Sequence, residues 1–124
     1  MNKVLDARDR GSVPPISEVM ESLRMFFDDI EAYAYMSNGE VILRLEYEVM
    51  VIRVPSRLGL RDLASYLFRL GAQVYRNRRY LDIVIQVNLG TWLALRAATI
   101  HAENNWTYIA IEPRKILNEE NAFP

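Results

Sequence analysis

Residues Glu40–Pro55 read EVILRLEYEVMVIRVP, and apolar side chains recur at every second position of this stretch. The alternating residues are Val41, Leu43, Leu45, Tyr47, Val49 and Val51. A period of two places them on one face of an extended strand, which we expect to be buried. From Met50 onward the intervening residues are mostly apolar as well, which is typical of a strand covered on both faces. Because no Gly, Pro or Asn marks a turn near Tyr47-Glu48, we predict a single long strand over Val41–Val54 at the centre of a sheet.

The remaining elements are assigned from the spacing of apolar residues. Steps of three and four residues indicate helices, whereas alternation indicates strands. The predicted order is a helix at Ile16–Met36, the long strand, a helix at Leu58–Leu70, strands at Gln73–Arg76 and Tyr80–Val87, a helix at Thr91–Asn104 and a strand at Trp106–Glu112. The helix at 91–104 is predicted from its four alanines, with Asn104-Asn105 as the break.

This order predicts an α+β fold. After the first helix it matches the two-layer ferredoxin-like sandwich, in which both helices lie on one face of the sheet. We expect the N-terminal helix, or a second copy of the chain, to cover the other face. A profilin-like layout of the roadblock type is the alternative, and it requires the chain to reverse at Tyr47-Glu48. We predict one domain over residues 16–113, with residues 1–15 as a flexible arm and residues 114–124 as a C-terminal tail.

Composition sets broad limits on the protein class. The chain has 124 residues, of which 51% are hydrophobic and 25% charged, as in a folded single domain. It has no cysteine, which excludes disulfides and thiolate metal sites and fits a reducing compartment. No apolar run approaches the ~20 residues of a membrane span, and no signal-peptide core is found near the N-terminus. We therefore expect a cytoplasmic protein without membrane contact. Thirteen arginines against two lysines suggest a GC-rich or heat-adapted (thermophile) source.

Charge is distributed unevenly along the chain. The net charge is −1, yet residues 44–80 carry eight arginines against three carboxylates, a local net of +5. Arginines at a turn bracketed by tyrosines can contact phosphates and stack on bases. The predicted nucleic-acid-binding residues are Arg57, Arg61, Tyr75, Arg76, Arg78, Arg79 and Tyr80. The alternatives are a turn that charge keeps soluble, or arginines that pair with an acidic helix of a partner.

No residue pattern predicts catalysis. His101 is the single histidine, and without cysteine the usual histidine and thiolate metal sites are not expected. No serine lies in a nucleophile-elbow context, and the glycines are isolated rather than grouped in a phosphate-binding loop. Asp28-Asp29 is interpreted as a solvated helix face. We therefore predict no catalytic residue, no metal and no cofactor.

The region Val49–Trp106 resembles a known family, the small non-catalytic subunit of the KEOPS complex, which modifies tRNA with threonylcarbamoyl-adenosine. The resemblance lies in the strand ending VMVIRVPS, the strand LDIVIQV and the segment GTWLALRAATI, with Pro55-Ser56 and Leu95-Arg96 in similar places. The polar Asp-Ser that opens the family's last helix is replaced here by Leu89-Gly90-Thr91. The resemblance implies a dimerising scaffold that binds a catalytic subunit and helps to hold tRNA.

Two functions are favoured by these patterns, ahead of a third, an enzyme with a site that the sequence does not reveal. The first is a non-enzymatic dimerising scaffold or accessory subunit in a nucleic-acid-linked complex, with the basic hairpin as the contact. The second is a protein–protein interaction or regulatory module of roadblock-like type that does not bind nucleic acid, and that uses an exposed sheet face or the cluster Met20, Met25, Phe26 and Phe27. A homo-oligomer or a protein partner is expected in both cases.

Overall fold

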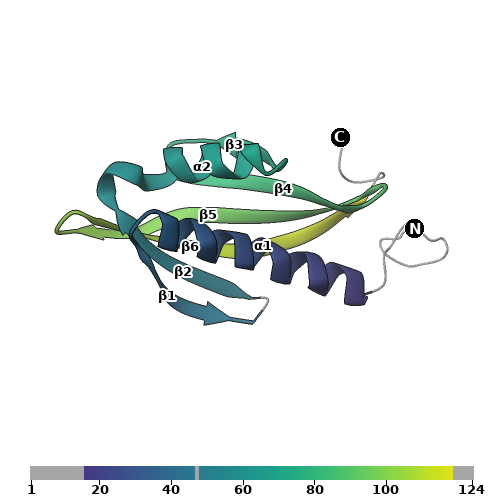
Figure 1. Cartoon of the computed structure of the whole chain (residues 1–124). Coiled ribbons are helices and arrows are strands. Elements are labelled where there is room, and N and C mark those ends of the chain that lie inside the picture. Colours follow the sequence, from purple (N-terminus) through teal and green to yellow (C-terminus); the bar gives the residue numbers. More distant parts are fainter. Residues whose placement is uncertain (1–15, 47, 119–124) are drawn as a thin grey trace.

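The computed structural model describes residues 16–46 and 48–118. Its elements are α1 (Ile16–Met36), β1 (Glu40–Leu45), β2 (Val49–Pro55), the 3₁₀ turn η1 (Ser56–Leu58), α2 (Gly59–Arg69), β3 (Gln73–Arg76), β4 (Tyr80–Asn88), β5 (Thr91–Glu103) and β6 (Trp106–Asn118). Two helices lie over one face of a single sheet, so the predicted α+β class is confirmed (Figure 1). The predicted arm at residues 1–15 lies outside the described residues.

The six strands form one antiparallel sheet in the order β1-β2-β6-β5-β4-β3. The two longest strands, β5 and β6, pair at its centre from Thr91 opposite Asn118 to Glu103 opposite Trp106. Helix α2 carries the chain from β2 to the far edge of the sheet, where β3 begins, and the chain then returns strand by strand (Figure 1). The predicted hairpin of β3 and β4 is confirmed, whereas β6 extends beyond the predicted domain end at residue 113.

The prediction of one strand over Val41–Val54 is wrong. The chain reverses between β1 and β2, which pair with Leu45 opposite Val49, and the N–H of Glu48 donates a hydrogen bond to the carbonyl oxygen of Leu45 over 3.1 Å. The turn leaves Leu45 and Val49 on the same face of the sheet. The alternation of apolar residues therefore continues across the turn, and the pattern contains no mark of the reversal.

The prediction of a helix over Thr91–Asn104 is also wrong, because these residues form β5 and the turn that follows it. Asn104 and Asn105 have φ angles of 50° and 74°, and two residues with positive φ make the tight turn that best suits a twisted hairpin. The ferredoxin-like order is not confirmed, since it needs a helix where β5 lies. The roadblock-type alternative required the reversal that is found, but within residues 16–46 and 48–118 no helix follows the last strands.

The hydrophobic core lies between the sheet and both helices. The apolar stripe predicted for α1 is confirmed at Val19, Leu23, Phe27, Ile30 and Ala34, which are buried. They pack in one cluster with the inward side chains of the sheet: Met50, Ile52, Val54, Leu81, Ile83, Leu93, Leu95, Ala97, Ile109 and Ile111. The expectation that α1 covers the second sheet face is wrong, because α1 shares the first face with α2 (Figure 1). We call the second face, which no described helix covers, the open face.

The junction between α1 and β1 depends on two residues with different roles. Asn38 takes the left-handed conformation that ends the helix, with a φ of 64°. Gly39 is needed for space, since a Cβ atom there would collide with the carbonyl oxygen of Arg53 and lie 3.1 Å from the Cα of Val54. On the same strand, Arg44 forms ion pairs of 2.9 and 2.7 Å with Asp28 and Glu31 of α1.

The two helices are joined by a pair of tyrosines. The rings of Tyr33 and Tyr66 lie 4.9 Å apart, the hydroxyl of Tyr66 donates to the carbonyl oxygen of Asp29 over 3.0 Å, and that of Tyr33 to the carbonyl oxygen of Leu58 over 3.4 Å. Burial raises the pKa of Tyr33 to about 12, although a hydrogen bond with Ser37 opposes the shift. Burial also raises the pKa of Tyr66.

Replacing Gly39→Ala is expected to lower the free energy of unfolding by about 2–3 kcal/mol, because the added methyl group meets the backbone of β2 rather than a movable side chain. Gly71→Ala is the control. Gly71 has a φ of 97° but nothing within 4 Å of its Cβ position, so only a backbone cost of about 1 kcal/mol is expected. Urea unfolding of the two variants measures the difference. Equal losses would show that the contact at Arg53 is not the cause.

The stability of the protein is expected to fall as the pH rises from 10 to 12. An unfolded tyrosine ionises near its ordinary pKa of 10, whereas folded Tyr33 keeps its proton until about 12, so ionisation favours the unfolded chain in this window. Below pH 10 both states are protonated and the contribution is fully present. Chemical denaturation at several pH values measures the slope, which Tyr33→Phe should reduce. An unchanged slope in Tyr33→Phe would contradict the assignment.

Candidate nucleic-acid interface

The predicted arginines gather on η1, α2 and the β3–β4 hairpin. Arg57 lies in η1 and Arg61 in the first turn of α2, while Arg76 ends β3 and Arg78 and Arg79 form the turn. Arg69, in the last turn of α2, lines the same groove as Arg61 and Arg76. All six side chains are exposed. We call this set the arginine edge: Arg57, Arg61, Arg69, Arg76, Arg78 and Arg79.

The backbone of the hairpin turn is fixed by one asparagine. The side-chain oxygen of Asn77 accepts hydrogen bonds from the N–H groups of Arg79 and Tyr80, over 2.8 and 3.0 Å. The N–H of Asn77 donates to the carbonyl oxygen of Tyr80 over 3.1 Å, which closes the turn. A side chain that mimics a backbone turn is a common role for asparagine. The two turn arginines are thus presented from a constrained backbone, which lowers the entropy lost when they bind.

A groove of about 440 Å³ separates α2 from β3. Three arginines line it: Arg61, Arg69 and Arg76. Ser65 adds a hydroxyl group and Phe68 a large aromatic ring, while Ala64 and Val74 form its apolar floor. Phe68 is 71% exposed, the largest exposure of any aromatic side chain in the described part of the molecule. The groove therefore combines positive charge with an uncovered ring face.

Ion pairing divides the arginines of the described residues into two groups. Each arginine outside the arginine edge has a carboxylate partner: Arg24 with Glu21, Arg44 with Asp28 and Glu31, Arg53 with Glu40, Arg96 with Asp82 and Arg114 with Glu112. Arg53 and Arg96 also stack on the rings of Trp106 and Tyr80. No carboxylate of residues 16–46 and 48–118 pairs with a member of the arginine edge. Six of the eight arginines of residues 44–80 thus lie on one surface that no described carboxylate neutralises.

The two tyrosines of the predicted site differ in their positions. Tyr75 is 57% exposed on the edge strand β3, and its hydroxyl donates to the side-chain oxygen of Gln73 over 3.0 Å. Tyr80 is half-buried on the open face, where the guanidinium carbon of Arg96 lies 3.8 Å from its ring centroid. The register pairs Tyr75 with Asp82, so its side chain points to the open face and not into the groove that Val74 and Arg76 line. The structure therefore places both predicted tyrosines on the open face, and gives Tyr80 a partner within the sheet.

Phe68 was missed from the sequence, whereas Arg69 was considered as an extension of the basic patch but left out of the predicted binding residues. Phe68 directly follows the buried Leu67, and the sequence analysis assigned it no role. The sequence does contain a signal that Phe68 is exposed. It lies between Arg61 and Arg69 and does not follow the spacing of three and four residues that Leu63, Ala64 and Leu67 share on the buried side of the helix.

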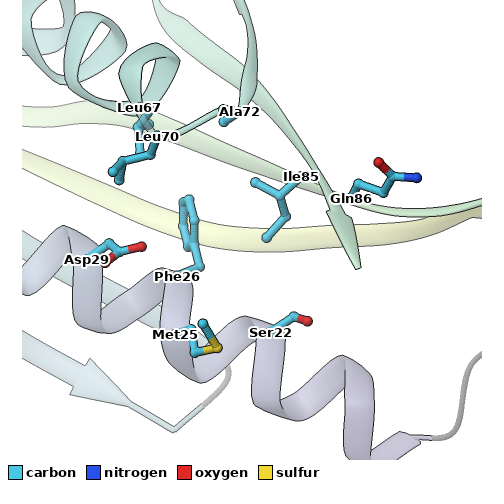
Figure 2. Close-up of a pocket in the computed structure, with 10 residues that line it drawn as sticks. Ser22, Met25, Phe26, Asp29, Leu67, Leu70, Ala72, Ile85 and Gln86 are labelled. Carbon is cyan, nitrogen blue, oxygen red and sulfur yellow. The ribbon is translucent and has the colours of Figure 1, made fainter. Parts of the chain in front are cut away.

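A second pocket, of about 300 Å³, lies between α1, the end of α2 and β4 (Figure 2). In Figure 2 the ring of Phe26 points from α1 toward Leu67 and Leu70, and Ile85 faces the same space from β4. Its one titratable lining group is Asp29, whose pKa is raised by burial and by the neighbouring charge of Asp28. Because a single carboxyl has no partner here, the pocket offers no acid–base pair.

Other polar groups give no sign of a reactive centre. His101 is exposed on β5, pairs with Glu103 over 2.9 Å and lies 5.6 Å from the ring of Tyr108. Among the residues that the structure describes, no three of the types His, Cys, Asp and Glu group as metal ligands. In the same part of the chain, neither helix has the length and apolar character needed to cross a membrane.

Comparisons with protein-family models, with curated proteins and with solved structures found no match to this chain. The geometry of the described residues therefore carries the functional argument.

Proposed function

We propose that this protein is a non-enzymatic accessory module that binds nucleic acid through the arginine edge. The observation that carries the proposal is the division of ion pairs: the arginine edge has no carboxylate partner among the described residues, while every other described arginine has one. The tRNA-linked role that the sequence resemblance implies belongs to the same proposal.

The charge of the arginine edge favours a polyanion. Six exposed guanidinium groups on η1, α2 and the β3–β4 hairpin repel one another, and a phosphate backbone relieves this repulsion while it releases its own counterions. The planar guanidinium also forms paired hydrogen bonds with phosphate oxygens, which lysine cannot do.

The groove between α2 and β3 favours a single strand over a duplex. Proteins that bind single-stranded nucleic acid combine a basic groove with aromatic side chains on which bases stack. Arg61, Arg69 and Arg76 supply the charge, and Phe68 supplies the ring. Bases that are available for stacking occur in single strands and in the loops of folded RNA such as tRNA, but not inside a duplex.

A protein-interaction role without nucleic acid is the second candidate. The observation that favours it is the open face, which carries apolar side chains such as Leu43 and Leu45, exposed to 43% and 45%. The two roles use different surfaces of the chain and are compatible with each other. If the protein binds nucleic acid, the open face would bind a protein partner in addition. If it does not, binding a protein partner through the open face would be its only function.

The double variant Arg78→Ala/Arg79→Ala is expected to weaken binding of tRNA and of single-stranded RNA. Each arginine that neutralises a phosphate adds about 0.7 to the slope of log affinity against log salt, so the slope should fall by about 1.4. Fluorescence anisotropy at several salt concentrations measures it. The matched control is Arg24→Ala/Arg44→Ala, which removes the same charge from arginines paired with carboxylates. No binding at low salt, or equal losses in both variants, would refute the proposal.

Phe68→Ala is expected to weaken binding of single-stranded RNA by about 1–3 kcal/mol, because one base loses its stacking partner. The salt slope should stay the same, since no charge is removed, and a duplex of the same length should be unaffected. The control is Leu70→Ala, which removes another exposed apolar side chain outside the groove. Anisotropy with both ligands measures the effects. Equal losses for duplex and single strand would contradict the stacking role.

A further inference from the structure

The open face is apolar where the chain reverses between β1 and β2. The side chains that alternate along this part of the sequence, Leu43, Leu45, Val49 and Val51, lie opposite one another in the register and point away from the helices. The core instead takes the residues between them, among them Met50 and Ile52, which are fully buried. The sequence pattern expected of a strand covered on both faces is therefore present, while only one face is covered by the described residues.

The rest of the open face continues this surface across the sheet. Its other apolar members come from β4, β5 and β6: Tyr80, Val84, Trp92, Ala94, Ala98, Tyr108 and Ala110. One row of charged groups crosses its centre, with Glu112 on β6 opposite Arg96 on β5, and Arg96 opposite Asp82 on β4; Lys115 lies in the next row, opposite Ala94. Arg96 pairs with Asp82 over 2.9 Å, and Glu112 with Arg114 over 3.0 Å.

The two central members of this row, Arg96 and Glu112, are complementary to the same two residues of a second copy. Strands β6 and β5 are the two middle strands of the six, so a two-fold axis that runs between them and parallel to them exchanges their positions. A second copy placed face to face by that axis sets its Arg96 over Glu112 of the first copy, and its Glu112 over Arg96. In the adjacent row Ala110 faces Ala98 of the other copy, so small side chains meet where the two sheets approach.

In packed sheets the strands of one sheet cross those of the other at about 30°. Because the two-fold axis bisects this angle, it is tilted by about 15° from the strands of each copy. Residues next to the axis are displaced least by this tilt, and Arg96, Glu112, Ala98 and Ala110 all lie there. Farther out, Val51 of β2 lies over Tyr80 of β4 from the other copy. The arrangement therefore places Arg96 with Glu112 next to the axis, and apolar side chains with one another in the row of Ala98 and Ala110.

We propose that the open face binds a second copy of this chain, in an isologous dimer with two Arg96–Glu112 ion pairs between copies. The area is sufficient. Six strands of four to thirteen residues, spaced by about 4.8 Å and rising about 3.4 Å per residue, give roughly 850 Å² of flat sheet, close to the ~800 Å² that each partner of a stable complex contributes. The proposal does not rest on nucleic-acid binding, because none of the six arginines of the arginine edge is part of it.

Sedimentation analysis and native mass spectrometry test the dimer. The wild-type chain should have twice the mass of the 14.4 kDa monomer. Arg96→Glu and Glu112→Arg each place two like-charge pairs in the interface, so each should raise the dissociation constant at least about 100-fold. Mixing the two variants restores both unlike pairs, and the mixture should form a heterodimer that neither variant forms with itself. Arg24→Glu, on α1, is the control and should leave the dimer intact.

A wild-type chain that stays monomeric at high micromolar concentration would overturn the proposal. So would a mixture of the two folded variants that fails to associate, since only this arrangement predicts the rescue. Circular dichroism checks that each variant folds. Val51→Lys is a second test, and it leaves the Arg96–Asp82 pair untouched. This variant should be monomeric, and a Val51→Lys chain that still forms the dimer would also overturn the proposal. RNA binding is measured on the same variants. A variant that loses the dimer but still binds RNA shows that the dimer and the proposed function are tested separately.

Discussion

The pairing of β5 with β6 is the constraint on which the rest of the structure depends. These strands form the centre of the sheet, and every other strand joins one side of this pair or the other. The two-residue turn at Asn104-Asn105 sets their register. A slip of one residue would turn Leu93 and Leu95 away from the helices and carry Arg96 into the core, where an unpaired charge is costly. The same register therefore decides both the core and the open face.

Part of the fold could be predicted from the sequence because local signals agree with it. The stripe of α1, the stop at Asn38-Gly39 and the hairpin of β3 and β4 are all specified by neighbouring residues. The central strand β5 could not be predicted in this way, since Ala94, Ala97 and Ala98 suit either period and alanine favours a helix in isolation. Only pairing with two neighbouring strands decides the question. The asparagine pair that was read as a helix break is the signal of the hairpin.

The candidate site was predicted in the same uneven way. A local cluster of charge shows in the sequence, so Arg76, Arg78 and Arg79 were found, and the structure adds that no carboxylate of the described residues pairs with them. Phe68 could not be assigned, since its exposure depends on which side of α2 packs against the sheet. Likewise the alternation of Leu43, Leu45, Val49 and Val51 was detected correctly, but its direction was reversed: it marks the open face rather than the core. Periodicity shows that two faces differ, and only the whole fold shows where each one lies.

The two proposed surfaces lie on different layers of the molecule, and this separation is what a small accessory module requires. The arginine edge is built from α2, the turn before it and the β3–β4 hairpin at one border of the sheet, whereas the open face lies on the side of the sheet opposite both helices (Figure 1). A face-to-face dimer would therefore leave its two helical layers outermost. The two-fold axis would place the two arginine edges at opposite borders of the assembly, so that one dimer presents two basic surfaces. Two linked sites raise the affinity for a long polyanion without any new contact, provided that the strand spans both. In a protein of this size, pairing of copies is thus a direct way to make a weak electrostatic site effective.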